Sequence, residues 1–116
     1  MKTIFTLPMP PSANRIWRNN RGRTHRSAEY LAWIQEAGLK LNAQCVPSIE
    51  PPYAVHYAFG RKDNRRTDLL NREKPLSDLL QKCEVITDDR KINIALIQWA
   101  DDVAPGTVRV TVESLG

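Results

Sequence analysis

The stretch that decides the fold is residues 53–60, Tyr53-Ala54-Val55-His56-Tyr57-Ala58-Phe59-Gly60. Its large apolar side chains fall on every second residue, and this period of two predicts a strand with one face in a core. Gly60 is expected to end the strand, and His56 is expected to hydrogen-bond within the sheet rather than to bind a ligand. A strand of this kind needs neighbouring strands and a covering layer, which the flanking segments should supply.

The segments after Gly60 predict one helix and two further strands. The helix should begin near Pro75, which suits a first turn, and its apolar stripe at helical spacing is Leu76, Leu79, Leu80 and Cys83. Residues 92–99 alternate as a strand, and residues 108–112 do so again through Val108, Val110 and Val112. Pro105-Gly106 reads as a turn between them, so these last two strands are predicted to form a hairpin.

The segments before residue 53 predict one strand and one helix. Residues 3–7 form the strand, which Pro8, Pro10 and Pro11 end, and a long polar loop follows to about Thr24. Ser27 can cap a helix whose predicted apolar stripe is Leu31, Ile34, Gly38 and Leu41. The order strand-helix-strand-helix-strand-strand predicts an α/β (α+β) fold, a single domain over residues 1–116 with a mixed sheet of about four strands and two helices.

Length and composition fit a small intracellular protein. With 116 residues, 41% of them hydrophobic, the chain can bury one core but not two. No segment approaches the roughly 18 uninterrupted apolar residues of a membrane span, and the N-terminal apolar run is too short for a secretory signal. Cys45 and Cys83 lie far apart and outside any Cys-x-x-Cys pair. We therefore expect small buried thiols and a cytoplasmic location rather than a disulfide framework or structural zinc.

The distribution of charge points to nucleic acid. No acidic residue precedes Glu29, whereas six lysines and arginines do. A second basic run, Arg61-Lys62 and Arg65-Arg66, is interrupted by Asp63 and one uncharged polar residue. Arginine presents a planar fork suited to phosphate oxygens, although a solvated charged face is the plain alternative. Trp17, within the first basic segment, could stack on DNA or pack. The candidate DNA-binding residues are Arg15, Arg18, Arg21, Arg23, His25, Arg26, Arg65, Arg66 and Lys74.

Three acidic residues near the second basic run suggest metal-dependent hydrolysis of a phosphodiester. Asp68 lies at the mouth of the second helix, and Asp88 and Asp89 follow that helix directly before a strand. One short helix between them could bring both loops to one end of the sheet, with Lys74 available to the phosphate. Carboxylates are the ligands that Mg²⁺ prefers. The alternative is that Asp68 caps the helix and that Asp88 and Asp89 form a turn.

Two blocks of sequence resemble the RusA family of Holliday-junction resolvases over nearly the whole chain. The first covers residues 7–15 and 20–27, and the second comprises Arg65-Arg66-Thr67-Asp68-Leu69-Leu70-Asn71, Lys74-Pro75, Asp78-Leu79-Leu80 and Asp88-Asp89. The resemblance implies a homodimer, from a bacterial or phage-type host, that cuts four-way DNA junctions symmetrically with Mg²⁺ or with Mn²⁺ in its place. It matches Asp68 and Asp89 to metal-binding carboxylates, Asp88 to the acid beside the latter, and Lys74 to a lysine needed for cleavage.

One position departs from the family motif, which reads Asp-x-Asp-Asn. This chain has Leu70 in place of the second acid, so one expected metal ligand is missing. Asp88 is favoured as the third ligand beside Asp68 and Asp89, and Glu73 is the other candidate if the segment is helical. The leading hypothesis is therefore an active, Mg²⁺-dependent junction endonuclease of DNA recombination and repair. The alternatives are a junction-binding protein whose cleavage is weak or lost because of Leu70, and a nuclease for another branched DNA or for RNA.

Overall fold

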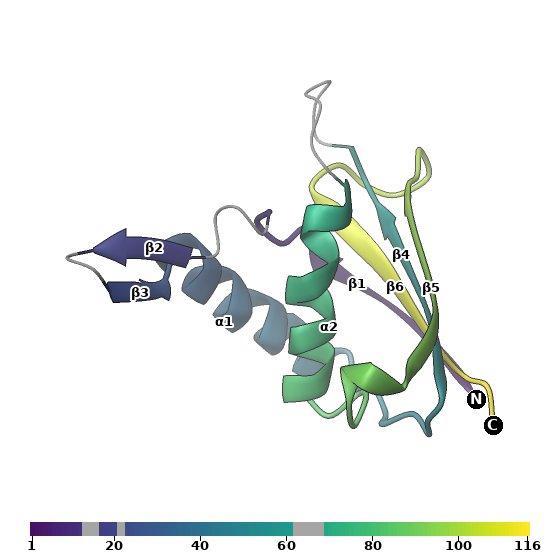
Figure 1. The fold of residues 1–116 in the computed structure, drawn as a ribbon. Coiled ribbons are helices and arrows are strands. Elements are labelled where there is room, and N and C mark those ends of the chain that lie inside the picture. The colour runs from purple at the N-terminus through teal and green to yellow at the C-terminus, as the bar shows by residue number, and fades with distance from the viewer. Residues whose placement is uncertain (13–16, 21–22, 62–68) are drawn as a thin grey trace.

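A four-stranded mixed sheet with strand order β1-β6-β4-β5 forms the body of the molecule (Figure 1). The computed structural model describes residues 1–12, 17–20, 23–61 and 69–116, and for residues 17–20 and 23–26 it describes the backbone. The central strand β4 (Tyr53–Phe59) pairs antiparallel with β6 (Thr107–Ser114) and parallel with β5 (Ile92–Trp99), and β1 (Lys2–Pro8) pairs antiparallel with β6. This arrangement confirms the predicted mixed sheet.

Both helices cover the same face of the sheet, and the core lies between them and β4 (Figure 1). The alternation read in the deciding stretch is present, because Tyr53, Val55, Tyr57 and Phe59 are all at most 2% exposed. The helix α2 (Glu73–Lys82) buries Leu76, Leu79 and Leu80 of its predicted stripe against them. On the opposite face His56 Nε2 is 2.9 Å from Gln98 Oε1, which confirms that this histidine is satisfied within the sheet.

The helix α1 (Ala28–Ala43) begins where predicted but buries a different face. The Ser27 hydroxyl accepts a hydrogen bond from the Tyr30 amide at 3.1 Å, so the cap is confirmed. The predicted stripe of Leu31, Ile34, Gly38 and Leu41 is wrong in part: Leu41 is buried and Ile34 packs against the core, but Leu31 is 50% exposed. The other buried residues of the helix are Tyr30, Trp33 and Ala37. Two aromatic side chains bury more apolar area than Leu31 does, and the Trp33 indole donates to the Pro8 carbonyl at 2.9 Å, which sets the rotation of the helix.

The predicted hairpin of the last two strands is wrong. Since α2 carries the chain back along the sheet, β5 starts at the same end as β4 and pairs with it in parallel. The chain then crosses the end of β4, and β6 returns on the other side of β4, between β4 and β1. Backbone bonds fasten the crossing at Gly60, whose amide donates to Thr107 O at 2.9 Å. A period of two identifies strands but does not identify their partners.

A second, two-stranded sheet lies within the segment that was expected to be a polar loop. It consists of β2 (Trp17–Asn20) and β3 (Arg23–Arg26), paired antiparallel. The hairpin projects away from the main sheet beyond the N-terminal end of α1 (Figure 1). Its residues are almost all polar, so the sequence has no hydrophobic alternation from which these strands could be predicted.

The structure bears on two expectations drawn from composition, one on the cysteines and one on membrane-spanning segments. Both cysteines are free thiols, but Cys45 is exposed and Cys83 is half-buried, so the expectation of two buried thiols is wrong. Cys45 has φ of 52° at the end of α1, a conformation that turns the chain and leaves its side chain outside the core. Among the described residues, no helix has the length and apolar character needed to cross a bilayer.

Gly60 should be intolerant of a side chain. A Cβ there would lie 2.0 Å from the Ala104 carbonyl oxygen and 2.6 Å from its carbonyl carbon, both in the backbone of the crossing segment. We expect Gly60→Ala to lower the free energy of unfolding by about 1–3 kcal/mol because that segment must shift. Urea denaturation of the purified variant measures the effect.

Gly38→Ala is the matched control for this substitution. A Cβ at Gly38 meets nothing within 4 Å, and the residue lies inside α1, where alanine is favoured over glycine. It should stabilise the protein by about 0.5–1 kcal/mol. Equal effects of the two substitutions would contradict the steric role assigned to Gly60.

Candidate functional site

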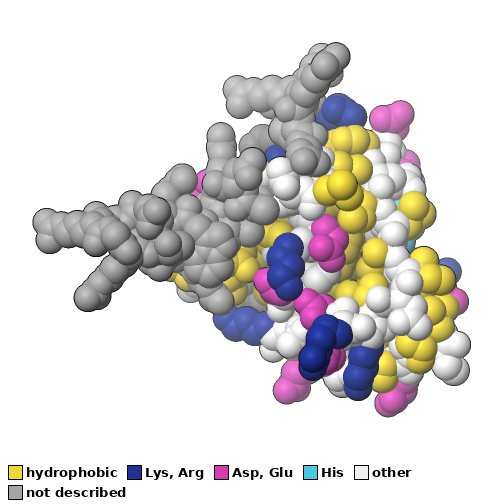
Figure 2. Space-filling model, in the orientation of Figure 1, with side chains coloured by type: hydrophobic (Ala, Val, Ile, Leu, Met, Phe, Trp, Pro, Cys, Tyr) yellow, Lys and Arg dark blue, Asp and Glu magenta, His cyan; other side chains and the backbone are white. Residues whose placement is uncertain are grey.

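An open hollow lies between α2 and the edge strand β5. Two short 3₁₀ helices border it, η2 (Leu69–Arg72) before α2 and η3 (Asp89–Lys91) before β5. Figure 2 shows acidic and basic side chains gathered beside apolar ones on this face. The residues that line the hollow are Leu70, Glu73, Lys74, Asp89, Arg90, Ile92, Ala95 and Ile97. Charged groups from two distant segments therefore meet over an apolar floor supplied by β5.

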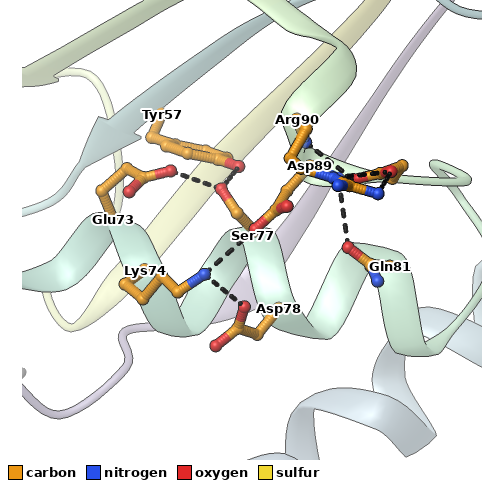
Figure 3. Close-up of polar contacts among 9 residues, drawn as sticks. Tyr57, Glu73, Lys74, Ser77, Asp78, Gln81, Asp89 and Arg90 are labelled. Carbon is orange, nitrogen blue, oxygen red and sulfur yellow. Dashed lines mark hydrogen bonds and ion pairs between the residues drawn. The ribbon is translucent and has the colours of Figure 1, made fainter.

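Lys74 and Asp89 form the centre of the polar cluster (Figure 3). The Lys74 ammonium donates to Asp89 Oδ2 at 3.0 Å and forms an ion pair with Asp78 Oδ1 at 3.1 Å. The bond to Asp89, and then the bond to Asp78, raise the pKa of Lys74 above its usual range. Lys74 therefore remains a cation at any physiological pH.

The main chain and α2 together place Asp89. Its amide donates to the Gln81 side-chain carbonyl at 3.1 Å, which anchors the start of η3 to the later part of α2. Asp89 and Lys74 are fifteen residues apart in sequence, and their side chains meet because α2 packs its apolar stripe on β4. The structure thus brings two of the predicted catalytic residues together.

Asp88 is turned away from this cluster. It caps η3 by accepting the Arg90 amide at 2.9 Å, and its Oδ2 accepts from the Arg90 guanidinium at 2.8 Å and 3.0 Å. The Arg90 side chain, followed by its amide, lowers the pKa of Asp88 to about 2. Asp88 does not line the hollow, so its carboxylate serves the turn.

A chain of hydroxyl groups runs from the core to Glu73 (Figure 3). Ser77 Oγ donates to Glu73 Oε1, and the Tyr57 hydroxyl lies 2.9 Å from Ser77 Oγ. Burial raises the pKa of Tyr57, so this hydroxyl stays protonated. Because the single proton of the Ser77 hydroxyl goes to Glu73, Tyr57 is the donor to Ser77. Tyr57 and Ser77 are 0% and 2% exposed. Sequence reasoning missed both residues, although a serine inside a leucine stripe is a signal that could have marked them.

Most of the predicted DNA-binding set, and one predicted ligand, fall outside what the structure can place. Asp68, Arg15, Arg21, Arg65 and Arg66 lie outside the described residues. The remaining members other than Lys74 belong to the β2–β3 hairpin, where the backbone alone is described: Arg18, Arg23, His25 and Arg26.

The donor chemistry of the hollow suits a hard cation. Its lining offers the carboxylates of Glu73 and Asp89 but no thiolate or imidazole, which fits Mg²⁺ or Mn²⁺ better than zinc. Within the described residues, no three metal-binding side chains converge in one place. Asp68, which directly precedes η2, would have to complete such a set, so the residues present fit a divalent ion in part.

Comparison with known proteins identifies relatives of this chain. The family model described as Endodeoxyribonuclease RusA matches residues 8–113. The chain is 34% identical over 113 residues to the crossover junction endodeoxyribonuclease RusA of Escherichia coli strain K12, covering 97% of this chain and 94% of that protein. The corresponding proteins of Shigella sonnei strain Ss046 and Enterobacteria phage 82 are 33% and 31% identical over the same shares. The matched region includes the whole polar cluster.

The pairing of Asp88 with Arg90 predicts a pH-dependent contribution to stability. The folded pKa of about 2 is below the ordinary value of 3.8, so the contribution is present above the ordinary value and lost as the pH falls through about 2. Asp88→Ala should lower the melting temperature by a constant amount near neutral pH, and that difference should shrink in acid. Calorimetry of both proteins from about pH 7 to about pH 2 tests this, and a difference that persists undiminished in acid would contradict it.

Proposed function

The chain belongs to the RusA family of endodeoxyribonucleases, and from this membership we propose that it resolves four-way DNA junctions by paired symmetric nicks that depend on Mg²⁺. The observation that carries the proposal is the meeting of Lys74 with Asp89 in an exposed hollow beside η2. Its curated relatives carry the name crossover junction endodeoxyribonuclease and come from bacteria and a phage. The protein would act on DNA inside a bacterial cell, in recombination and repair.

Asp68 and Asp89 are the residues proposed to hold Mg²⁺, with Mn²⁺ able to replace it. The bound ion would neutralise charge on the scissile phosphate and lower the pKa of a coordinated water. Asp89 supports this role because it lies in the hollow with only a quarter of its side chain exposed, and its amide is held by Gln81. Asp68 stands five residues before the start of α2 in sequence, at the family's first motif position.

Lys74 is proposed to bind a phosphate oxygen of the scissile group. Its ammonium has three N–H donors, of which two point to Asp89 and Asp78. Its side chain is 62% exposed, so the third donor can reach DNA. Because its pKa is raised, Lys74 cannot accept a proton from water at neutral pH, and it stabilises negative charge instead of acting as a base.

The basic segments are proposed to hold the arms of the junction. The β2–β3 hairpin carries Arg18, Arg23 and Arg26 outward from α1, and the run at Arg65-Arg66 precedes η2. Arginine contacts to phosphates are strong but independent of base sequence. Binding should therefore weaken steeply as the salt concentration rises.

A homodimer is proposed to form through the edge strand β5. This strand has no charged residue among its eight positions, and Ile94 and Leu96 are 56% and 52% exposed on one of its faces. Long apolar edges of this kind are usually protected or paired. The opposite edge, β1, is protected by Lys2 and Pro8. Antiparallel pairing of two β5 strands is two-fold symmetric and would set both hollows beside the axis, one for each opposed DNA strand.

Binding without cutting is the second candidate, and Leu70 is the observation that favours it. Leu70 lines the hollow and is 69% exposed, so an apolar side chain occupies space where the family motif has an acid. Losing one carboxylate removes charge and oxygen ligands from a hard-cation site. Under this candidate, the basic segments would still bind junctions.

A cleavage assay on a synthetic four-way junction separates the two candidates. Under the first, the wild type gives paired nicks with Mg²⁺ or Mn²⁺, chelation abolishes them, and Asp89→Asn lowers the rate by at least about a hundredfold because a ligand is lost. Leu70→Asp then only adjusts an existing rate. Under the second, the wild type binds without nicking and Leu70→Asp creates cleavage. Competition by linear duplex and by RNA at moderate salt tests the choice of substrate.

Leu96→Arg should convert the dimer to a monomer, because it places a charge in the proposed β5 contact. Sedimentation velocity measures the change. Ile4→Arg is the matched control, since Ile4 is similarly exposed, at 57%, on the same face but on the protected edge strand β1. A dimer that survives Leu96→Arg would rule out this contact.

A further inference from the structure

We infer that Glu73 supplies the metal-binding carboxylate that is missing at Leu70. The inference rests on the proposed Mg²⁺-dependent function, because it concerns the ion that this function requires. It departs from the expectation that Asp88 is the third ligand, and it gives Tyr57 and Ser77 a role in the site. Three features of the described residues carry it.

The first feature is the relative position of Leu70 and Glu73. The segment from Leu69 to Arg72 is a 3₁₀ helix, and Glu73 follows as the first residue of α2. A 3₁₀ helix has three residues per turn, so side chains at i and i+3 stand one above the other. Both side chains line the same hollow as Asp89. A glutamate one turn further along, with one more methylene than aspartate, can thus reach the space that an acid at position 70 would occupy.

The second feature is the buried pair that holds Glu73. Ser77, one turn later on α2, donates to Oε1, and Tyr57 of β4 donates to Ser77 in turn. Within the described part of the chain, Glu73 Oε2 has no hydrogen-bond donor. Two hydroxyl groups in the core are costly unless they satisfy each other, and here they also fix the direction of one half-buried carboxylate at the hollow. Fixing a ligand through such outer partners is how protein sites orient carboxylates toward a metal.

The third feature is the commitment of Asp88 elsewhere. Both of its oxygens accept hydrogen bonds from Arg90, and one of them also caps η3. Recruiting Asp88 to a metal would break the cap and release the guanidinium, whereas recruiting Glu73 breaks nothing. Glu73 is therefore the better placed of the two candidates.

Titration of DNA-free protein with Mn²⁺, followed by calorimetry, tests the inference without relying on cleavage. Glu73→Gln, which keeps the shape of the side chain, should weaken Mn²⁺ binding by at least roughly tenfold, as loss of even an outer partner does. Ser77→Ala should weaken it by a smaller factor. Asp88→Asn is the matched control and should leave Mn²⁺ affinity within about twofold of the wild type. Melting temperatures confirm that each variant is folded.

Rescue gives the sharpest result. In the Glu73→Gln background, Leu70→Asp should restore Mn²⁺ affinity, because it returns a carboxylate to the same space from one turn earlier. Wild-type affinity in Glu73→Gln, lost affinity in Asp88→Asn, no Mn²⁺ binding by the wild type, or failure of Leu70→Asp to rescue would each overturn the inference.

The two proposals can fail separately. If Mn²⁺ binding depends on Glu73 but no junction is cut, the inference stands and the proposed endonuclease activity fails. If junctions are cut with Mg²⁺ while Glu73→Gln binds Mn²⁺ normally, the activity stands and the inference fails.

Discussion

The burial of one face of α2 against β4 is the interaction on which the rest of the site depends. Leu76, Leu79 and Leu80 are each at most 2% exposed, and each contributes roughly 1.5–3 kcal/mol by leaving water. With that face fixed, the helix has no rotational freedom, and its flank must present Glu73 and Lys74 to the hollow. The same packing delivers Ser77 to Tyr57 inside the core. Core packing and site geometry are therefore a single constraint, and a shift of α2 large enough to break one would break the other.

Sequence alone predicted the elements in which apolar residues recur at a regular spacing, and it missed elements that have no such spacing. The alternation in β4 and the stripe of α2 were predicted because each places apolar groups on one face. The β2–β3 hairpin was missed because its strands are polar. The face of α1 was assigned from leucine spacing, yet the indole bond from Trp33 to Pro8 decided it. The partner of β6 depends on where the chain crosses β4 at Gly60, and a local pattern contains no information about that crossing.

The candidate site shows the same division: the sequence indicates which residues belong to it but not which partners their side chains bind. Residue identity pointed to Lys74 and Asp89, and the structure brings them to 3.0 Å. Residue identity could not separate Asp88 from Glu73, because both are acids close to the motif. What separates them is the competition for each carboxylate. Arg90 lies two residues from Asp88 and donates to both of its oxygens. Glu73 instead accepts from the buried Ser77 hydroxyl through one oxygen, Oε1.

The contact between Arg72 and Pro10 joins two parts of the molecule that the sequence keeps far apart. Arg72 Nη1 donates to the Pro10 carbonyl at 2.7 Å. The segment that follows β1 and leads toward the β2–β3 hairpin is therefore bonded to the 3₁₀ helix η2, which precedes α2. The Trp33 bond to Pro8 adds a second contact, so this segment is bonded to α1 as well as to η2. The chain that leaves β1 is therefore held against both α1 and η2 before it reaches residue 13, so the start of the basic segment and the hollow beside η2 belong to one rigid body.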